Sequence, residues 1–106
     1  MECEIILNND TLIAQLDGEI DHHTARGIRE KIDGEIENNS PKKLVLDFTD
    51  VTFMDSSGIG LIMGRYKQMK ALNGELKIKN PSPNTLRVFK LAGVDRLAQI
   101  ERSETI

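Results

Sequence analysis

The order in which strand-like and helix-like segments alternate along this chain restricts its fold more than any other feature. Two short apolar runs, at 4–8 and 11–17, are separated by the turn-forming letters NND, which predicts a hairpin. Helical patterns then alternate with strand-like runs at 43–48, 75–80 and 97–101. Helical crossovers between successive strands make those strands parallel and the connections right-handed. We therefore predict an α/β domain with a mixed, mostly parallel sheet of about five strands.

Three helices are expected between these strands. The first ends at Ser40–Pro41, and the second follows residues 53–60 and ends at Asn73–Gly74, a pair suited to a left-handed cap. The third is short, is capped by Asn84 and runs through Leu91. The first helix is expected to bury Ala25, Ile28, Ile32 and Ile36. The second is expected to bury Ile59, Ile62, Met63, Tyr66, Met69 and Leu72.

The strands alternate between apolar and polar side chains. Leu44, Leu46 and Phe48, for example, alternate with Val45 and Asp47. A sheet covered by helices on both faces would instead have nearly continuous apolar strands. We therefore expect the helices mainly on one face of the sheet, with the other face largely open to water.

The size and charge of the chain indicate one globular domain over residues 1–106. Hydrophobic residues make up 39% and charged residues 29% of the 106, which is ordinary for a globular protein. The net charge is −3, and no face is dominated by Lys and Arg, so no direct contact with nucleic acid is expected. Arg65, Lys67 and Lys70 are expected to form the solvated side of the second helix.

The sequence carries no signal for secretion or membrane insertion. Cys3 is the only cysteine, so no intrachain disulfide can form. The letters MECEII lack the basic and apolar regions of a signal peptide, and no apolar run approaches the ~20 residues that span a bilayer. We expect a cytoplasmic protein with no membrane contact.

The stretch FMDSSGIG, residues 53–60, begins the second helix and invites several interpretations. Asp and Ser are preferred helix caps, so a helix start alone would account for it. A dinucleotide site using Gly58, Gly60 and Gly64 is disfavoured, because the acid that should follow about 20 residues later is missing. These glycines are expected instead to let the helix pack closely on the sheet.

Catalytic and metal-binding sites are not predicted. A hydrolase would pair a serine with His22 or His23, but the pattern G-x-S-x-G is absent. No His, Cys or carboxylate set around the histidines has the spacing of metal ligands. We expect no catalytic residue and no metal, and the histidines are expected to be packing or capping groups.

A serine in this stretch is also suited to be a substrate. A hydroxyl at a helix start is exposed and lies at the positive end of the helix dipole, where a phosphate is tolerated. Phosphorylation there would change the surface charge by about −1.5 to −2 without unfolding the domain. The residues alone leave the helix cap and the phosphate acceptor both open.

Two segments taken together resemble a known family. GEIDHHTA (18–25) and FMDSSGIGLIMGRYKQMK (53–70) are similar to the anti-anti-sigma factors of spore-forming bacteria, which belong to the STAS-domain family, and the resemblance continues through NPSP (80–83). It implies a protein whose unphosphorylated form binds an anti-sigma factor that is also a serine kinase, which releases a sporulation sigma factor. The kinase then phosphorylates the antagonist, which lets go, and a PP2C-type phosphatase restores it.

The resemblance also assigns roles to residues. It implies Ser56, the first serine of the D-S-S-G motif, as the phosphate acceptor, and a partner-binding surface made of Asp21, Asp55, Ser56, Ser57 and Gly58. The protein itself is expected to need no cofactor, since ATP and Mg²⁺ belong to the kinase. The alternative is a STAS phospho-switch module of another partner-switching stress or sensing pathway. The family usually continues into a further helix, which RSETI (102–106) is expected to begin.

Overall fold

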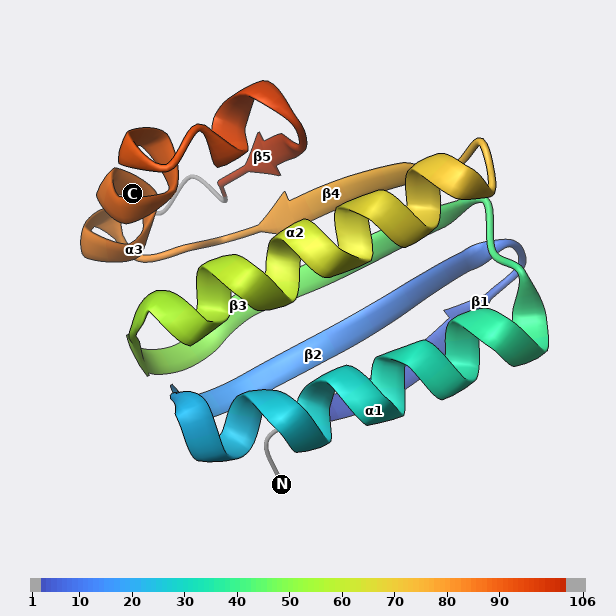
Figure 1. The fold of residues 1–106 in the computed structure, drawn as a ribbon, viewed down its shortest axis with the longest axis horizontal. Coiled ribbons are helices and arrows are strands. Elements are labelled where there is room, and N and C mark those ends of the chain that lie inside the picture. The colour runs from blue at the N-terminus through green and yellow to red at the C-terminus, as the bar shows by residue number, and fades with distance from the viewer. Residues whose placement is uncertain (1–2, 103–106) are drawn as a thin grey trace.

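The computed structural model describes residues 3–102 and contains one five-stranded sheet with the spatial order β1-β2-β3-β4-β5 (Figure 1). The strands are β1 (Cys3–Asn8), β2 (Thr11–Ile20), β3 (Lys43–Met54), β4 (Glu75–Lys79) and β5 (Gln99–Glu101). β1 pairs antiparallel with β2, and every following pair is parallel. The predicted hairpin and the mixed, mostly parallel sheet are confirmed. The helix expected to begin within RSETI falls largely outside the described residues.

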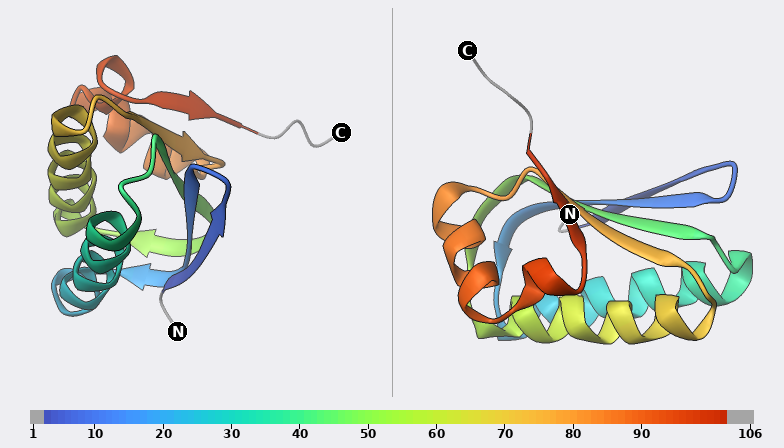
Figure 2. Two further views of the ribbon diagram at one scale, coloured as in Figure 1. Left: turned by 90° about the vertical axis from the view of Figure 1, so that its right-hand side faces the viewer. Right: turned by 90° about the horizontal axis from the view of Figure 1, so that it is seen from above.

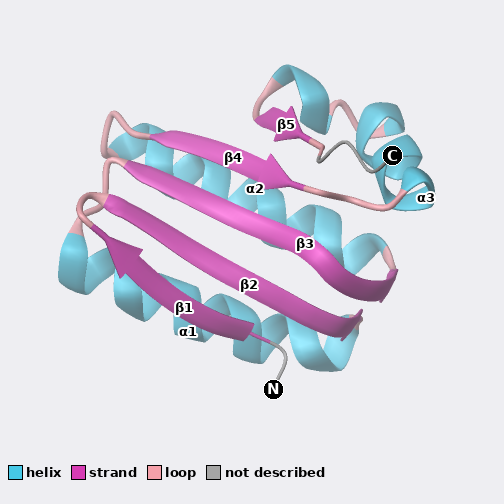
Figure 3. Cartoon of the chain, turned by 180° about the vertical axis from the view of Figure 1, so that it is seen from behind, coloured by secondary structure: helices cyan, strands magenta, loops and turns pink. Residues whose placement is uncertain are grey.

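The helices gather on one side of this sheet. They are α1 (His22–Asn39), α2 (Ser56–Ala71), α3 (Pro83–Leu91) and the short 3₁₀ helix η1 (Val94–Arg96). α1 and α2 run side by side across one face of the sheet (Figure 2), and the view from behind shows the strands uncovered (Figure 3). The expected one-sided cover is confirmed. Among the described residues no helix is both long and apolar enough to cross a membrane.

The core lies between the sheet and the two long helices. The alternating apolar residues on the covered face of β2, β3 and β4 are all buried: Leu12, Ala14, Leu16, Leu44, Leu46, Phe48, Leu76 and Ile78. Ile28, Ile32 and Ile36 of α1 pack against them. Each fully buried Leu, Ile or Phe contributes about 1.5–3 kcal/mol relative to an exposed one, so the alternation fixes which face is covered.

Both central strands are longer than predicted. β3 continues to Met54 rather than Phe48, and β2 continues to Ile20 rather than Asp17. The added part of β3 contains two register shifts, each of which places one extra residue opposite β2. Such bulges interrupt the two-residue alternation, which is why the sequence pattern ends before the strand does.

The carboxyl-terminal elements differ from prediction in their limits. Ser82, not Asn84, caps α3: its Oγ accepts a hydrogen bond from the N–H of Thr85 at 3.2 Å, and Pro83 is the first helical residue. Proline suits that position because its missing N–H would have no helical partner there. The predicted strand at 97–101 is shortened to Gln99–Glu101, because η1 and a turn precede it.

The buried face of α2 is rotated from the predicted one. Its buried residues are Gly58, Leu61, Ile62, Arg65 and Met69. Leu72, expected in the core, is 42% exposed, whereas Arg65, expected in solvent, is only 5% exposed. The prediction for Arg65 is wrong because α2 packs against α1 as well as the sheet, and α1 supplies a carboxylate opposite this position.

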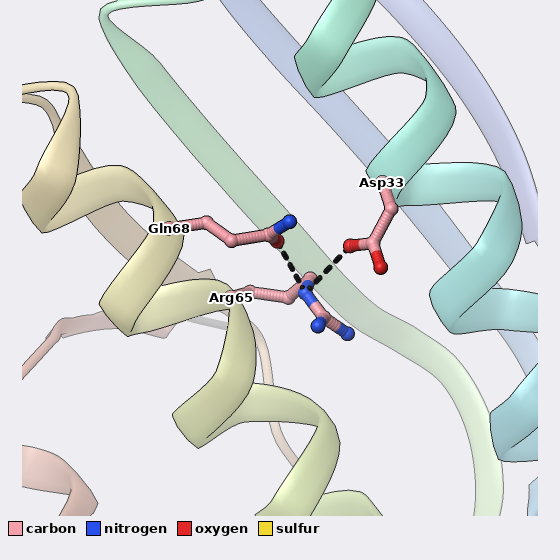
Figure 4. A network of polar contacts seen from close by, with 3 residues as sticks. All are labelled: Asp33, Arg65 and Gln68. Carbon is pink, nitrogen blue, oxygen red and sulfur yellow. Dashed lines mark hydrogen bonds and ion pairs between the residues drawn. The ribbon is translucent and has the colours of Figure 1, made fainter.

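That carboxylate belongs to Asp33, which is half-buried and forms an ion pair with the buried Arg65 (Figure 4). Arg65 Nε lies 3.1 Å from Asp33 Oδ1 and donates its hydrogen bond to Gln68 Oε1 at 2.7 Å. The contact with Asp33 is therefore mainly electrostatic. Burial lowers the pKa of Arg65, and Asp33 opposes that shift. The ion pair joins the two helices at a point where a lone charge would be costly.

We expect Asp33→Ala to lower the free energy of unfolding by about 2–3 kcal/mol, because it leaves the Arg65 guanidinium buried without a counter-charge. The double variant Asp33→Leu with Arg65→Met should recover most of this loss, since it removes both charges and leaves apolar side chains in their place. Urea unfolding followed by circular dichroism measures both. A single variant as stable as the wild type would contradict a structural role for the pair.

Candidate functional site

The residues singled out by the sequence meet where β2 and β3 end together. Ile20 pairs with Met54, so Asp21 and Asp55 follow at neighbouring positions, and the N–H of Asp55 donates to the carbonyl of Ile20 at 3.1 Å. Each aspartate starts a helix, which places the amino-terminal ends of α1 and α2 at the same edge of the sheet (Figure 1). Asp21 and the Ser56 end of α2, which the family resemblance assigns to one surface, therefore lie close together.

Asp21 is the N-cap of α1. Its Oδ1 accepts hydrogen bonds from the N–H groups of His23 at 2.9 Å and Thr24 at 3.0 Å. In return, Thr24 Oγ1 accepts from the N–H of Asp21 at 2.9 Å, which completes a capping box. The hydrogen bond from Thr24 is the main cause that lowers the pKa of Asp21. The carboxylate is thus held charged and in a fixed orientation at the protein surface.

Asp55 caps α2, and neither serine hydroxyl takes part in the cap. Its Oδ1 accepts from the N–H of Ser57 at 2.7 Å. Ser56 is the first residue of the helix and is exposed, whereas Ser57 is half-buried. Within residues 3–102 the Ser56 hydroxyl makes no hydrogen bond. The helix-cap interpretation therefore accounts for Asp55 and leaves the Ser56 hydroxyl unused by the fold.

Gly58 lies beneath this surface rather than on it. It is buried, and the Met54 side chain occupies the space that a Cβ at position 58 would need. The absence of a side chain at Gly58 lets α2 start close to the end of β3, beneath the residues that the resemblance assigns to the partner surface. The same packing role does not extend to Gly60 and Gly64, where a Cβ would meet open space.

The two histidines are neither packing nor capping groups. His22 and His23 are exposed on the first turn of α1, with their rings edge to face at 6.3 Å. The cap comes from Asp21, to which His23 contributes only its backbone N–H. In the described part of the chain no group of three or more His, Cys, Asp or Glu is arranged to hold a metal ion.

Sequence reasoning missed a groove between the first turns of α1 and α2. Its volume is about 510 Å³, and it is lined by His22, Ala25, Arg26, Arg29, Ser57, Gly60 and Leu61. The spacing of Arg26 and Arg29 places both on the flank of the apolar stripe of α1. Nothing in the sequence shows that this flank faces α2, because that depends on how the two helices lie on the sheet.

A second, smaller hollow has a volume of about 260 Å³. It separates the end of β3 from the start of α3, and Thr52, Phe53 and Val88 are among its lining residues. Phe53 is 52% exposed and Val88 is 39% exposed. Exposed apolar side chains at the end of β3 and on α3 are typical of a surface that another protein covers.

The STAS domain model matches residues 2–105, and the chain belongs to the STAS domain family. An anti-sigma F factor antagonist of Lysinibacillus sphaericus is 35% identical over 84% of this chain and 76% of its own length. Another from Paenibacillus polymyxa is 33% identical over 98% of this chain and 89% of its own. An anti-sigma-B factor antagonist of Bacillus subtilis is 32% identical over 88% of this chain and 84% of its own.

Solved structures agree with these relatives. The unphosphorylated form of the anti-sigma factor antagonist SpoIIAA superimposes with a TM-score of 0.85 at 31% identity, over 96% of this chain and 88% of that one. SpoIIAA of Bacillus in its phosphorylated form gives a TM-score of 0.78 over 96% of this chain and 91% of that one, again at 31% identity. Fold and sequence together place this chain among STAS proteins of the anti-sigma factor antagonist type.

We expect Asp21→Ala to lower the urea midpoint of unfolding at pH 7, because two backbone N–H groups lose their acceptor. The pKa of Asp21 is lower in the folded protein than in the unfolded chain. The charged carboxylate therefore stabilises the fold at pH values above the unfolded pKa of about 3.9. This stabilisation is lost as the pH falls through the folded-state pKa. The gap between wild type and variant should therefore narrow below about pH 4.

Unfolding curves between pH 7 and pH 3 measure this gap. Glu37→Ala, which removes an exposed carboxylate farther along α1, is the matched control and should change the midpoint little at either pH. Equal midpoints for wild type and Asp21→Ala at pH 7 would contradict the capping role.

Proposed function

We propose that this protein is an anti-sigma factor antagonist switched by phosphorylation of Ser56. Its unphosphorylated form binds an anti-sigma factor that is also a serine kinase, and so releases a sporulation sigma factor. The observation that carries the proposal is the Ser56 hydroxyl, which is exposed and unused by the fold at the point where two capped helices meet. The STAS relatives named as anti-sigma factor antagonists support the class of partner.

Phosphoryl transfer suits the surroundings of Ser56. The γ-phosphoryl group of ATP moves to Ser56 Oγ, the hydroxyl loses its proton, and ADP leaves with the kinase, which holds both ATP and Mg²⁺. Ser57 is a poorer acceptor because it is half-buried beside the groove. The antagonist contributes no catalytic group and no cofactor. A PP2C-type phosphatase hydrolyses the phosphoserine and returns the protein to its binding form.

Charge rather than rearrangement is the proposed mechanism of release. A phosphate on Ser56 lies at the start of α2, where the helix dipole favours an anion by roughly 0.3–1 kcal/mol, so the fold has no reason to change. A partner packed against a neutral hydroxyl, however, would have to bury an unpaired dianion, which costs several kcal/mol. At 1.4 kcal/mol for each factor of ten, ~3 kcal/mol weakens binding about a hundredfold.

A second candidate is the same switch in another partner-switching pathway, such as a stress response. The similarity to an anti-sigma-B factor antagonist of Bacillus subtilis supports this second candidate. The segments HHT (22–24) and GRYKQMK (64–70) favour the sporulation branch. Titration against the anti-sigma F and anti-sigma B factors of one organism separates the two, because only the cognate kinase should bind tightly.

Incubation with the kinase, ATP and Mg²⁺ should place one phosphate on Ser56, mapped by mass spectrometry. Ser56→Ala should remain unmodified and bind persistently, and Ser57→Ala should still be phosphorylated. The phosphorylated wild type should bind about a hundredfold more weakly than the unmodified form by calorimetry. Phosphate on Ser57, or equal affinity of the two forms, would contradict the proposal.

Asp21→Asn should weaken binding to the anti-sigma factor, because it removes the charge offered to a basic group of the partner. Asparagine also caps helices well, so the urea midpoint at pH 7 should stay close to that of the wild type. Calorimetric titration beside urea unfolding separates the two effects. Wild-type affinity would exclude Asp21 from the contact surface.

A further inference from the structure

The packing between α1 and α2 holds more positive than negative charge. Arg26 has Glu30 at 3.5 Å, and Arg65 has Asp33 at 3.1 Å. For Arg29, by contrast, residues 3–102 provide no carboxylate within 4 Å. Arg29 is therefore a positive charge without an ion-pair partner among these residues, whereas Arg65 is paired with Asp33.

The buried guanidinium of Arg65 lies close enough to Arg29 to be affected by this imbalance. Arg65 Nη1 and Asp33 Oδ1 are both buried, and neither has a hydrogen-bond partner among the described residues. The terminal nitrogens of its guanidinium turn away from both Asp33 and Gln68 (Figure 4). Burial is the first cause that lowers the pKa of Arg65, and the positive charge of Arg29 lowers it further. An additional anion near Arg29 would relieve this repulsion.

The groove between α1 and α2 is where such an anion has access. Arg26, Arg29 and His22 line one wall, and Ser57 lines the other. The groove has a volume of about 510 Å³, whereas one molecule of liquid water takes about 30 Å³. The groove is therefore much larger than one small oxyanion needs. Ser57 directly follows Ser56, so the groove is continuous with the proposed contact surface.

We propose that this groove receives an acidic side chain of the anti-sigma factor, whose carboxylate pairs with Arg29. The proposal rests on the function proposed above, because it needs that protein partner. It adds a second charge contact of opposite sign to the one at Asp21. The surface would then carry a negative charge at the helix cap and a positive charge one to two turns along α1. A partner with the complementary pair of charges can match both in only one orientation, which is how charge patterns fix the register of an interface.

Arg29→Gln tests the groove without removing a buried group, since Arg29 is exposed. We expect the unphosphorylated variant to bind the cognate anti-sigma factor about tenfold more weakly than wild type in low salt, and Arg29→Glu to bind more weakly still. The difference should shrink as salt is raised. Lys67→Gln is the matched control, because it removes one exposed positive charge from α2 outside the groove, and it should retain wild-type affinity.

The outcomes separate the groove from the switch. If wild type and Arg29→Gln bind equally tightly, or Lys67→Gln loses as much as Arg29→Gln, the groove proposal is overturned and the proposed function stands. If the wild type binds no anti-sigma factor, both the groove proposal and the proposed function are overturned. A parallel titration with inorganic phosphate, followed by nuclear magnetic resonance, identifies a small-ion site. Tight phosphate binding that requires Arg29, with partner affinity unchanged in the variant, would also overturn the proposal.

Discussion

The pairing of β2 with β3 up to their last residues is the constraint on which the site depends. Ile20 lies opposite Met54, and the hydrogen bond from the Asp55 N–H to the Ile20 carbonyl holds together the points where the chain leaves the two strands. The segments that follow β2 and β3 must then both begin their helices at the same edge of the sheet. Because each turn has its own aspartate cap, the helix starts are rigid, and Asp21 and Ser56 keep fixed positions relative to each other.

Much of this arrangement follows from the sequence. Alternation along the strands predicts the covered face of the sheet, and the stripe of α1 predicts its buried isoleucines, because both depend on local periodicity. The joint position of Asp21 and Ser56 also follows, since the ends of parallel strands share an edge. The role proposed for Ser56 comes from family resemblance, because an exposed serine at a helix start is physically ordinary.

What the sequence could not show depends on contacts between elements. Arg65 looks like a surface residue until Asp33 of the neighbouring helix is known, since burial of a charge is acceptable only with its partner. The length of β3 is hidden by two bulges. The groove beside Ser57 exists only because α1 and α2 lie next to each other, and the free charge of Arg29 becomes visible only when each carboxylate nearby has been assigned.

The central claim is that phosphorylation changes the charge of a rigid surface and leaves the fold in place. Backbone amide spectra of the protein before and after complete phosphorylation test this most directly. The account predicts that chemical shifts change only around residues 20–24 and 53–60, with the sheet and the Arg65–Asp33 contact undisturbed. Large shifts throughout β4, α3 or the far ends of α1 and α2 would contradict it, because they would mean that the switch works by rearrangement.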